Sequence, residues 1–295
     1  MNRKEQLIEK LCARWNAPTP QLAINEALGA AFPNLYELSL PVRLSHLALQ
    51  RGVVDIYKKQ MNFDGIISAN SKGSYIIQVN RDHPESRRRF TIAHELGHTF
   101  FFELDGGIGQ RVRDTNLYGI SRSDSEEVLC NYAAAEILMP RRQFGAMIRD
   151  SGPSSESIIR LARSFNVSLQ AVSKRALQLL PYKLVIILWQ YNPTDKTYHS
   201  KWATGVTLTN RRATVRLVVG PQDPAFKFFH AQDNYRGRVW ISLDGPLEDY
   251  FVDAIAWRNG TTRKVLTVFV LERNPRALLA NCPIRASQET QMSLF

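Results

Sequence analysis

The composition of the chain changes at Pro181, and that change constrains the fold more than any other feature of the sequence. Before it, most segments have the apolar spacing of helices, with three short strands between residues 53 and 80. After it, runs of β-branched and aromatic residues alternate with turn residues, a pattern typical of antiparallel strands. We therefore expect an α+β protein, with a mainly helical domain over residues 1–181 that includes a small sheet, and a β-rich domain over residues 182–295.

Several elements of the first domain follow from spacing and turn residues. Leu7, Leu11 and Trp15 lie four residues apart, which predicts an amphipathic helix at the start. A short helix is expected from Leu44 to Gly52, because glycine commonly follows a helix C-terminus. The polar turn NSKG at 70–73 should join two strands as a hairpin. Further helices are expected over 90–103, 125–139, 141–150, 155–164 and 168–180.

The composition is that of a soluble globular protein, with 44% hydrophobic and 22% charged residues. No apolar stretch approaches the roughly 20 residues needed to span a bilayer, and the first residues lack the apolar run of a secretion signal. The three scattered cysteines imply no disulfide framework, so we expect a cytoplasmic protein. The net charge of +11 suits a nucleic acid or an acidic protein partner, but it suits a solvated basic surface equally well.

The segment HELGH at 94–98 carries the strongest chemical signal in the chain. Residues i and i+4 of a helix share one face, so the imidazoles of His94 and His98 can bind one metal ion. Glu95 lies beside them, where it can act as the general base that accepts a proton from an attacking water. Zinc fits these ligands, although manganese and iron are not excluded. A metzincin would continue with glycine and histidine, and this chain does not.

The third ligand is expected to be a carboxylate on the following helix. Glu126, Glu127 and Glu136 are all chemically suitable. Spacing favours Glu127, because Asn131 then lies one turn later on the same face and can orient a ligand by hydrogen bonding. Glu126 would face Cys130, and Glu136 lies near the helix end. The alternative is that these glutamates only complement the positive N-terminus of the helix.

These segments together resemble the ImmA/IrrE family of bacterial metallopeptidases. The resemblance rests on RFTIAHELGHTFFF, on the strand IIQVN before it, and on EVLCNYAAAEILMP after it. It covers roughly residues 40–180 and implies Glu127 as the third ligand, with Asn131 as the paired amide. Cys130 stands in place of the usual alanine, and Leu129 stands where a second glutamate is often found.

The resemblance implies a zincin-like fold and an endopeptidase whose substrate is a helix-turn-helix repressor. Its cleavage would switch on stress-response or mobile-element genes. The resemblance does not cover residues 182–295, for which we expect a sensor or regulatory function. Two other functions stay open. One is a DNA-binding regulator with a structural or vestigial zinc site, and the other is the peptidase effector of a toxin–antitoxin or phage-defence system.

The segment 161–180 has the pattern of a helix-turn-helix. Its second helix would present Gln170, Ser173 and Lys174 to DNA. The same pattern describes a helical hairpin over 155–180 that packs beside the catalytic core, and the resemblance favours this hairpin.

Two further segments are ambiguous. Residues 104–125 are expected to form a long surface loop, of the kind that covers a functional site. Tyr118 in that loop and Tyr132 after it are candidate oxyanion stabilisers, but packing or surface roles explain both tyrosines better. The aromatic and basic stretch 224–240 suits a nucleic-acid surface or a core strand with a polar loop.

Overall fold

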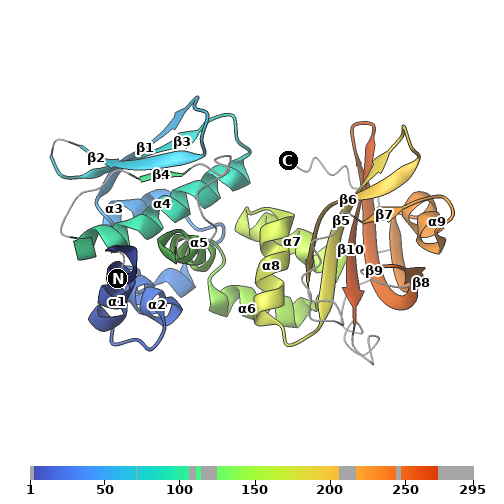
Figure 1. Cartoon of the computed structure of the whole chain (residues 1–295), viewed down its shortest axis with the longest axis horizontal. Helices are drawn as coiled ribbons and strands as arrows, with labels where there is room; N and C mark the ends of the chain where they lie inside the picture. Colours follow the sequence, from blue (N-terminus) through green and yellow to red (C-terminus); the bar gives the residue numbers. More distant parts are fainter. Residues whose placement is uncertain are drawn as a thin grey trace. The chain divides into compact units, whose positions relative to one another are not determined.

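A computed structural model describes residues 3–70, 72–105, 111–113, 125–205, 217–243 and 247–271. Over these ranges the protein is a mixed α+β structure with two separate sheets (Figure 1). Its contacts form two compact units, namely 1–143 with 164–168, and 144–163 with 169–295. The domain boundary expected at 181/182 stays a prediction. No helix in the described ranges is long and apolar enough to cross a membrane.

Two of the expected helices in the first unit are confirmed. Helix α1 (Arg3–Arg14) buries Leu7 and Leu11, as their spacing predicts. Helix α3 (Leu44–Gln50) ends just before Gly52, which has a positive φ of 72°. A short 3₁₀ turn, η1, lies between α1 and α3 at Leu35–Glu37.

Helix α2 (Pro20–Ala31) was not expected from the sequence, where the nearby prolines suggest a break. The Thr19 side chain caps it by accepting a hydrogen bond from the backbone N–H of Leu22, at 3.4 Å. Pro20 occupies the first turn, where a missing N–H costs nothing. The prolines therefore mark the start of a helix.

The sheet of the first unit has the strand order β1-β3-β2-β4. The predicted hairpin is confirmed, because β2 and β3 pair antiparallel around a turn at Asn70, whose side chain accepts from the backbone N–H of Ser74. The pairing of β1 with β3 is parallel, which the sequence did not indicate. The strands are β1 (Val53–Lys59), β2 (Gly65–Ala69), β3 (Tyr75–Asn80) and β4 (Arg111–Arg113).

Helix α4 (Glu85–Asp105) lies against this sheet and also against helix α5 (Ser125–Leu138). Figure 1 shows α4 between the sheet and the helices α1, α2 and α5. The expected helix at 90–103 is thus confirmed and is longer at both ends. Buried Ala93 and Leu96 anchor its middle in the core of the unit.

The remaining expected helices are also confirmed, as α6 (Arg141–Ser151), α7 (Ser155–Phe165) and α8 (Leu169–Leu179). The strands after Pro181 form one antiparallel sheet with the order β7-β6-β5-β10-β9-β8, which confirms the expected pairing. Its strands are β5 (Leu184–Asn192), β6 (Thr197–Gly205), β7 (Val218–Val219), β8 (Asn234–Ile241), β9 (Glu248–Asn259) and β10 (Thr262–Val270).

The stretch 224–240 contains a core strand, since Asn234–Ile241 form β8, but Pro224–Ala231 before it form helix α9, which was not expected. Pro224 suits the first turn of a helix, and Ala225 and Phe229 lie four residues apart on its buried side. Phe229 joins a core that includes Trp189, whose indole N–H donates to Thr267 Oγ1 at 2.9 Å. Phe226, Phe228 and Tyr235 are partly buried against the same core, whereas Trp240 is exposed.

A buried charge joins α7 to the sheet. The backbone N–H of Ser155 donates to Asp253 Oδ1 at 2.7 Å, and the Ser155 hydroxyl donates to the Asp253 carbonyl at 2.6 Å. Arg236 Nε donates to the other carboxylate oxygen of Asp253 at 2.7 Å. A side chain from β9 therefore caps α7 and places a negative charge at its positive end.

Candidate metal centre

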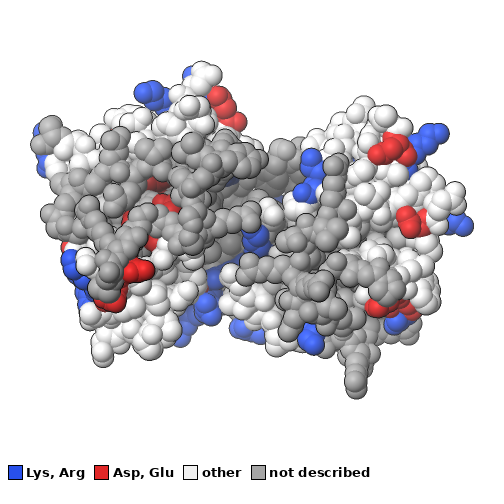
Figure 2. Space-filling model, in the orientation of Figure 1, with Lys and Arg blue, Asp and Glu red and all other residues white. Residues whose placement is uncertain are grey.

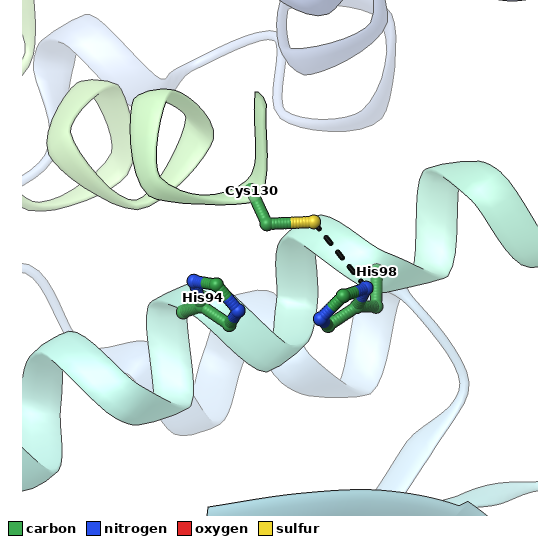
Figure 3. Close-up of side chains that lie close together, drawn as sticks. All are labelled: His94, His98 and Cys130. Carbon is green, nitrogen blue, oxygen red and sulfur yellow. Dashed lines mark hydrogen bonds between the residues drawn. The ribbon is translucent and has the colours of Figure 1, made fainter. Parts of the chain in front are cut away.

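His94 and His98 lie one turn apart on α4 and are both buried. Their ring centroids are 4.9 Å apart. Figure 3 shows both rings on the side of α4 that faces α5, with Cys130 of α5 pointing towards His98. The i, i+4 spacing thus brings two imidazoles to the same helix–helix interface.

Gly97 allows α5 to approach α4 closely at this point. A Cβ atom added at residue 97 would lie 3.0 Å from Cys130 Cα and 3.3 Å from the Cys130 carbonyl oxygen. These are backbone atoms, so a larger side chain would have to displace α5 itself. The glycine in HELGH therefore sets the separation of the two helices that carry the candidate ligands.

The carboxylate of Glu127 lies between the two imidazoles. Glu127 Oε2 is 3.1 Å from His94 Nε2, and Glu127 Oε1 is 3.3 Å from His98 Nε2. Burial alone would raise the pKa of Glu127, but its hydrogen bonds to the two histidines outweigh burial and hold that pKa well below its ordinary value. Three groups that can bind one divalent ion thus converge on one point.

The outer nitrogens of both imidazoles are held by other residues of α5. His94 Nδ1 lies 3.1 Å from Asn131 Oδ1, and His98 Nδ1 lies 2.9 Å from Glu126 Oε1. Both partner atoms are acceptors, which favours the tautomers with the proton on Nδ1. In these neutral tautomers the Nε2 lone pairs point towards the Glu127 carboxylate, where a metal ion would be held.

Glu126 was considered from the sequence only as a possible metal ligand, and its contact with His98 was not predicted. It was expected to face Cys130, and both residues do contact His98 Nδ1, with Cys130 Sγ at 3.4 Å. Its position four residues before Cys130 was the available signal, because i and i+4 share a helix face. That the face would meet His98 depends on how α4 and α5 pack, which neither helix reveals alone.

Cys130 is a second candidate for the third ligand. Its sulfur and ring nitrogens of His94 and His98 all lie within 4.8 Å of one another. Burial raises the pKa of the Cys130 thiol to about 11, although metal binding needs the thiolate. Cys130 also lies on the Nδ1 side of His98, whereas Glu127 lies on the Nε2 side of both imidazoles. The donor set His94, His98 and Glu127 therefore fits a divalent metal better.

The pKa of His98 is the result of opposing effects. Burial lowers it, while Cys130, Glu126 and Glu127 raise it, and the net pKa lies well above the ordinary value. The Cys130 thiol is uncharged at neutral pH because its own pKa is about 11. The two carboxylates are therefore the charges that attract a proton to His98 when no metal is bound.

The other residues named from the sequence lie as follows. Glu95 is fully buried on α4 next to His94. The Tyr132 hydroxyl donates to Asn25 Oδ1 at 3.1 Å, a contact with α2. Glu136 Oε1 accepts from Arg141 at 3.2 Å and so belongs to a different ion pair. Tyr118 lies outside the described residues, as does most of the expected loop at 104–125.

Comparison with known proteins supports a metal centre at this position. Residues 48–177 match the family model of Peptidase M78, described as the IrrE N-terminal-like domain. The chain is 30% identical over 172 residues to the radiation response metalloprotease IrrE of Deinococcus radiodurans, covering 54% of this chain and 52% of that protein. It is 29% identical over 153 residues to the protein of the same name from Deinococcus deserti, which covers 52% of this chain and 53% of that protein.

The chain therefore spans about half the length of the curated relatives it matches. A solved structure of a Mycobacterium tuberculosis transcriptional regulator covers 98% of this chain and 100% of its own, at 14% identity and a TM-score of 0.47, a similarity too low to support a conclusion. The match over 48–177 includes the HELGH segment and α5 with Glu127. These similarities support the resemblance of residues 48–177 to the ImmA/IrrE family of metallopeptidases.

Proposed function

We propose that the chain is a zinc-dependent endopeptidase with a zincin-like catalytic domain. The ligands would be His94, His98 and Glu127. The observation that carries the proposal is the convergence of both Nε2 atoms on the Glu127 carboxylate, at 3.1 and 3.3 Å. Three protein ligands with one position left for water or substrate are typical of a catalytic zinc site.

The residues around the ligands would divide the chemistry among them. A bound zinc ion supplies a Lewis acid that polarises a peptide carbonyl and lowers the pKa of water. Glu95 would take the proton from the attacking water and pass it to the leaving amine. Asn131 would hold His94 in the tautomer that directs Nε2 inwards, through the 3.1 Å contact at Nδ1.

Metal content of the purified protein is the first test. Elemental mass spectrometry should find about one zinc per chain in the wild type and in Glu95→Gln, because Glu95 is not a ligand. Glu127→Ala should lose most of the metal. Absence of metal from the wild type, and no uptake when zinc is offered, would contradict the proposal.

The substrate we propose is a protein, a helix-turn-helix transcriptional repressor in the same cytoplasm. Support comes from the family resemblance and from the two relatives, which are named as radiation response metalloproteases. Purified repressors encoded near this protein should be incubated with wild type and with Glu95→Gln, and the products identified by mass spectrometry. Cleavage by both proteins would mean a contaminating protease. Cleavage of an antitoxin or a phage protein would favour a toxin–antitoxin or phage-defence effector.

The rival function, a DNA-binding regulator, receives little support from α8. Ser173 is buried and its hydroxyl donates to the Leu169 carbonyl at 2.8 Å, so it is not presented to DNA. Arg175 on the same helix is buried too. On the face drawn in Figure 2, Lys and Arg side chains are spread over both units with acidic side chains among them. A salt-sensitive duplex interaction that survives Glu95→Gln would revive this rival.

We also propose that residues 182–295 act as a sensor or regulatory domain. Its support is a core of its own, built around Trp189, Tyr198 and Phe229 and separate from the candidate metal centre. A substitution in that core that changes the signal dependence of cleavage, without changing zinc content, would favour regulation.

A further inference from the structure

Two side chains of α5 contact the outer nitrogen of His98. Glu126 Oε1 lies 2.9 Å from Nδ1, and Cys130 Sγ lies 3.4 Å from the same atom. Glu126 is only 5% exposed, and Cys130 is fully buried. Burying a carboxylate is costly unless it receives a strong hydrogen bond, and the imidazole N–H of His98 supplies one.

The two imidazoles are held in different ways. His94 contacts a neutral amide, Asn131, whereas His98 contacts a carboxylate. A hydrogen bond to an ionised acceptor is roughly twice as strong as one between neutral groups. It also increases the electron density at the other ring nitrogen, which makes that nitrogen a better metal ligand.

We propose that Glu126 is a positioning residue, which holds the Nδ1–H of His98 and thereby directs and strengthens Nε2 as a metal ligand. Glu126 would not itself bind the metal, because it lies on the Nδ1 side of the ring while Glu127 lies on the Nε2 side. Adjacent glutamates at the start of α5 would thus have separate functions. This inference rests on the proposed metal site at His94, His98 and Glu127.

The test compares zinc affinity among purified full-length variants by competition with a chromophoric chelator. Glu126→Ala should weaken zinc binding by about 10- to 100-fold, the usual effect of losing such an outer partner. Glu126→Gln keeps the shape and an acceptor oxygen but not the charge, so its affinity should lie between Glu126→Ala and the wild type. Glu127→Ala should show the largest loss.

A matched control is available on the same helix. Glu136 is also a buried carboxylate of α5, but its Oε1 accepts from Arg141. Glu136→Gln should therefore keep the wild-type zinc affinity. Cys130→Ala should have a smaller effect than Glu126→Ala, because a neutral thiol is a weak hydrogen-bonding partner.

Cobalt substitution gives a readout that a merely structural function of Glu126 would not alter. The visible absorption of Co²⁺ reports the ligand field, so Glu126→Gln should shift its bands while circular dichroism of the metal-free protein stays unchanged. Wild-type affinity and an unchanged Co²⁺ spectrum in both Glu126 variants, together with metal loss in Glu127→Ala, would overturn this inference and leave the proposed site intact. Failure of the wild type to bind metal would overturn both.

Discussion

Replacing Gly97 by alanine tests whether the glycine of HELGH sets the distance between α4 and α5. The added Cβ would lie 3.0 Å from Cys130 Cα, 3.2 Å from Cys130 Cβ and 3.3 Å from the Cys130 carbonyl oxygen. Ordinary carbon–carbon contacts are about 3.5 to 4.0 Å. Helix α5 would therefore have to move by a few tenths of an ångström or more.

Two opposing terms set the magnitude. Alanine is favoured over glycine inside a helix by about 1 kcal/mol. Overpacking a buried contact costs about 1 to 3 kcal/mol, and the neighbour here is backbone, which cannot rotate away. The net loss of stability should thus be about 0 to 2 kcal/mol. The displacement should also move Glu127 away from the imidazoles. The loss in the free energy of zinc binding should therefore be larger than the loss in the free energy of unfolding.

Gly29 on α2 provides the matched control, because a Cβ added there would meet no atom within 4 Å. Gly29→Ala should stabilise the protein by about 0.5 to 1 kcal/mol, since only the helical preference changes. Urea unfolding of the metal-free proteins and chelator competition for zinc would measure the two quantities. The reasoning is refuted if Gly97→Ala stabilises the protein as much as Gly29→Ala and binds zinc as tightly as the wild type.

Three other predictions concern stability. With metal removed by a chelator, Glu127→Gln should lower the free energy of unfolding most between pH 4.5 and 6.5, which are the ordinary pKa values of Glu127 and His98. Folding lowers the pKa of Glu127 and raises that of His98, so within this range the folded protein holds a charged pair that the substitution removes. The loss of stability should become smaller as acid protonates Glu127, and also as the pH rises through the folded pKa of His98. Urea unfolding of both proteins over a pH series measures it, and a difference in unfolding free energy that does not change with pH would contradict the prediction. Asp253→Ala should cost about 1 to 3 kcal/mol, because the buried backbone N–H of Ser155 and the partly exposed Arg236 lose their shared carboxylate acceptor. Removal of the exposed carboxylate of Asp82, which pairs with Arg81, should cost less than about 1 kcal/mol. Equal effects in fluorescence-detected unfolding would contradict this. Thr19→Ala should destabilise the protein by about 1 kcal/mol through loss of the α2 cap, and Thr19→Ser should restore it in the same assay.

The elements with strong periodicity could be predicted from the sequence, and the exceptions have local causes. Helix α2 was missed because the prolines around Thr19 are breakers within a helix but favourable at its start. Helix α9 was missed because Phe226, Phe228 and Phe229 are aromatic residues typical of strands, and only tertiary packing shows that Phe229 is buried on one helical face.

The candidate site could be predicted to the extent that it depends on one helix at a time. The i, i+4 relation places His94 and His98 on one face, and the same relation links Glu127 to Asn131. The contact between Glu126 and His98 depends on the separation and crossing of α4 with α5, which come close together at Gly97. Sequence periodicity contains no information about that crossing.

The contacts of Ser155 with Asp253 decide where this chain can be divided for expression. A fragment that ends at residue 181 would keep α7 but remove Asp253, so the N–H of Ser155 would lose its acceptor. A loss of cleavage in such a fragment would report a damaged helix as readily as a missing regulator. Fragments should therefore be judged first by whether α7 is still folded, and regulation by residues 182–295 is better studied with point substitutions that leave Asp253 in place.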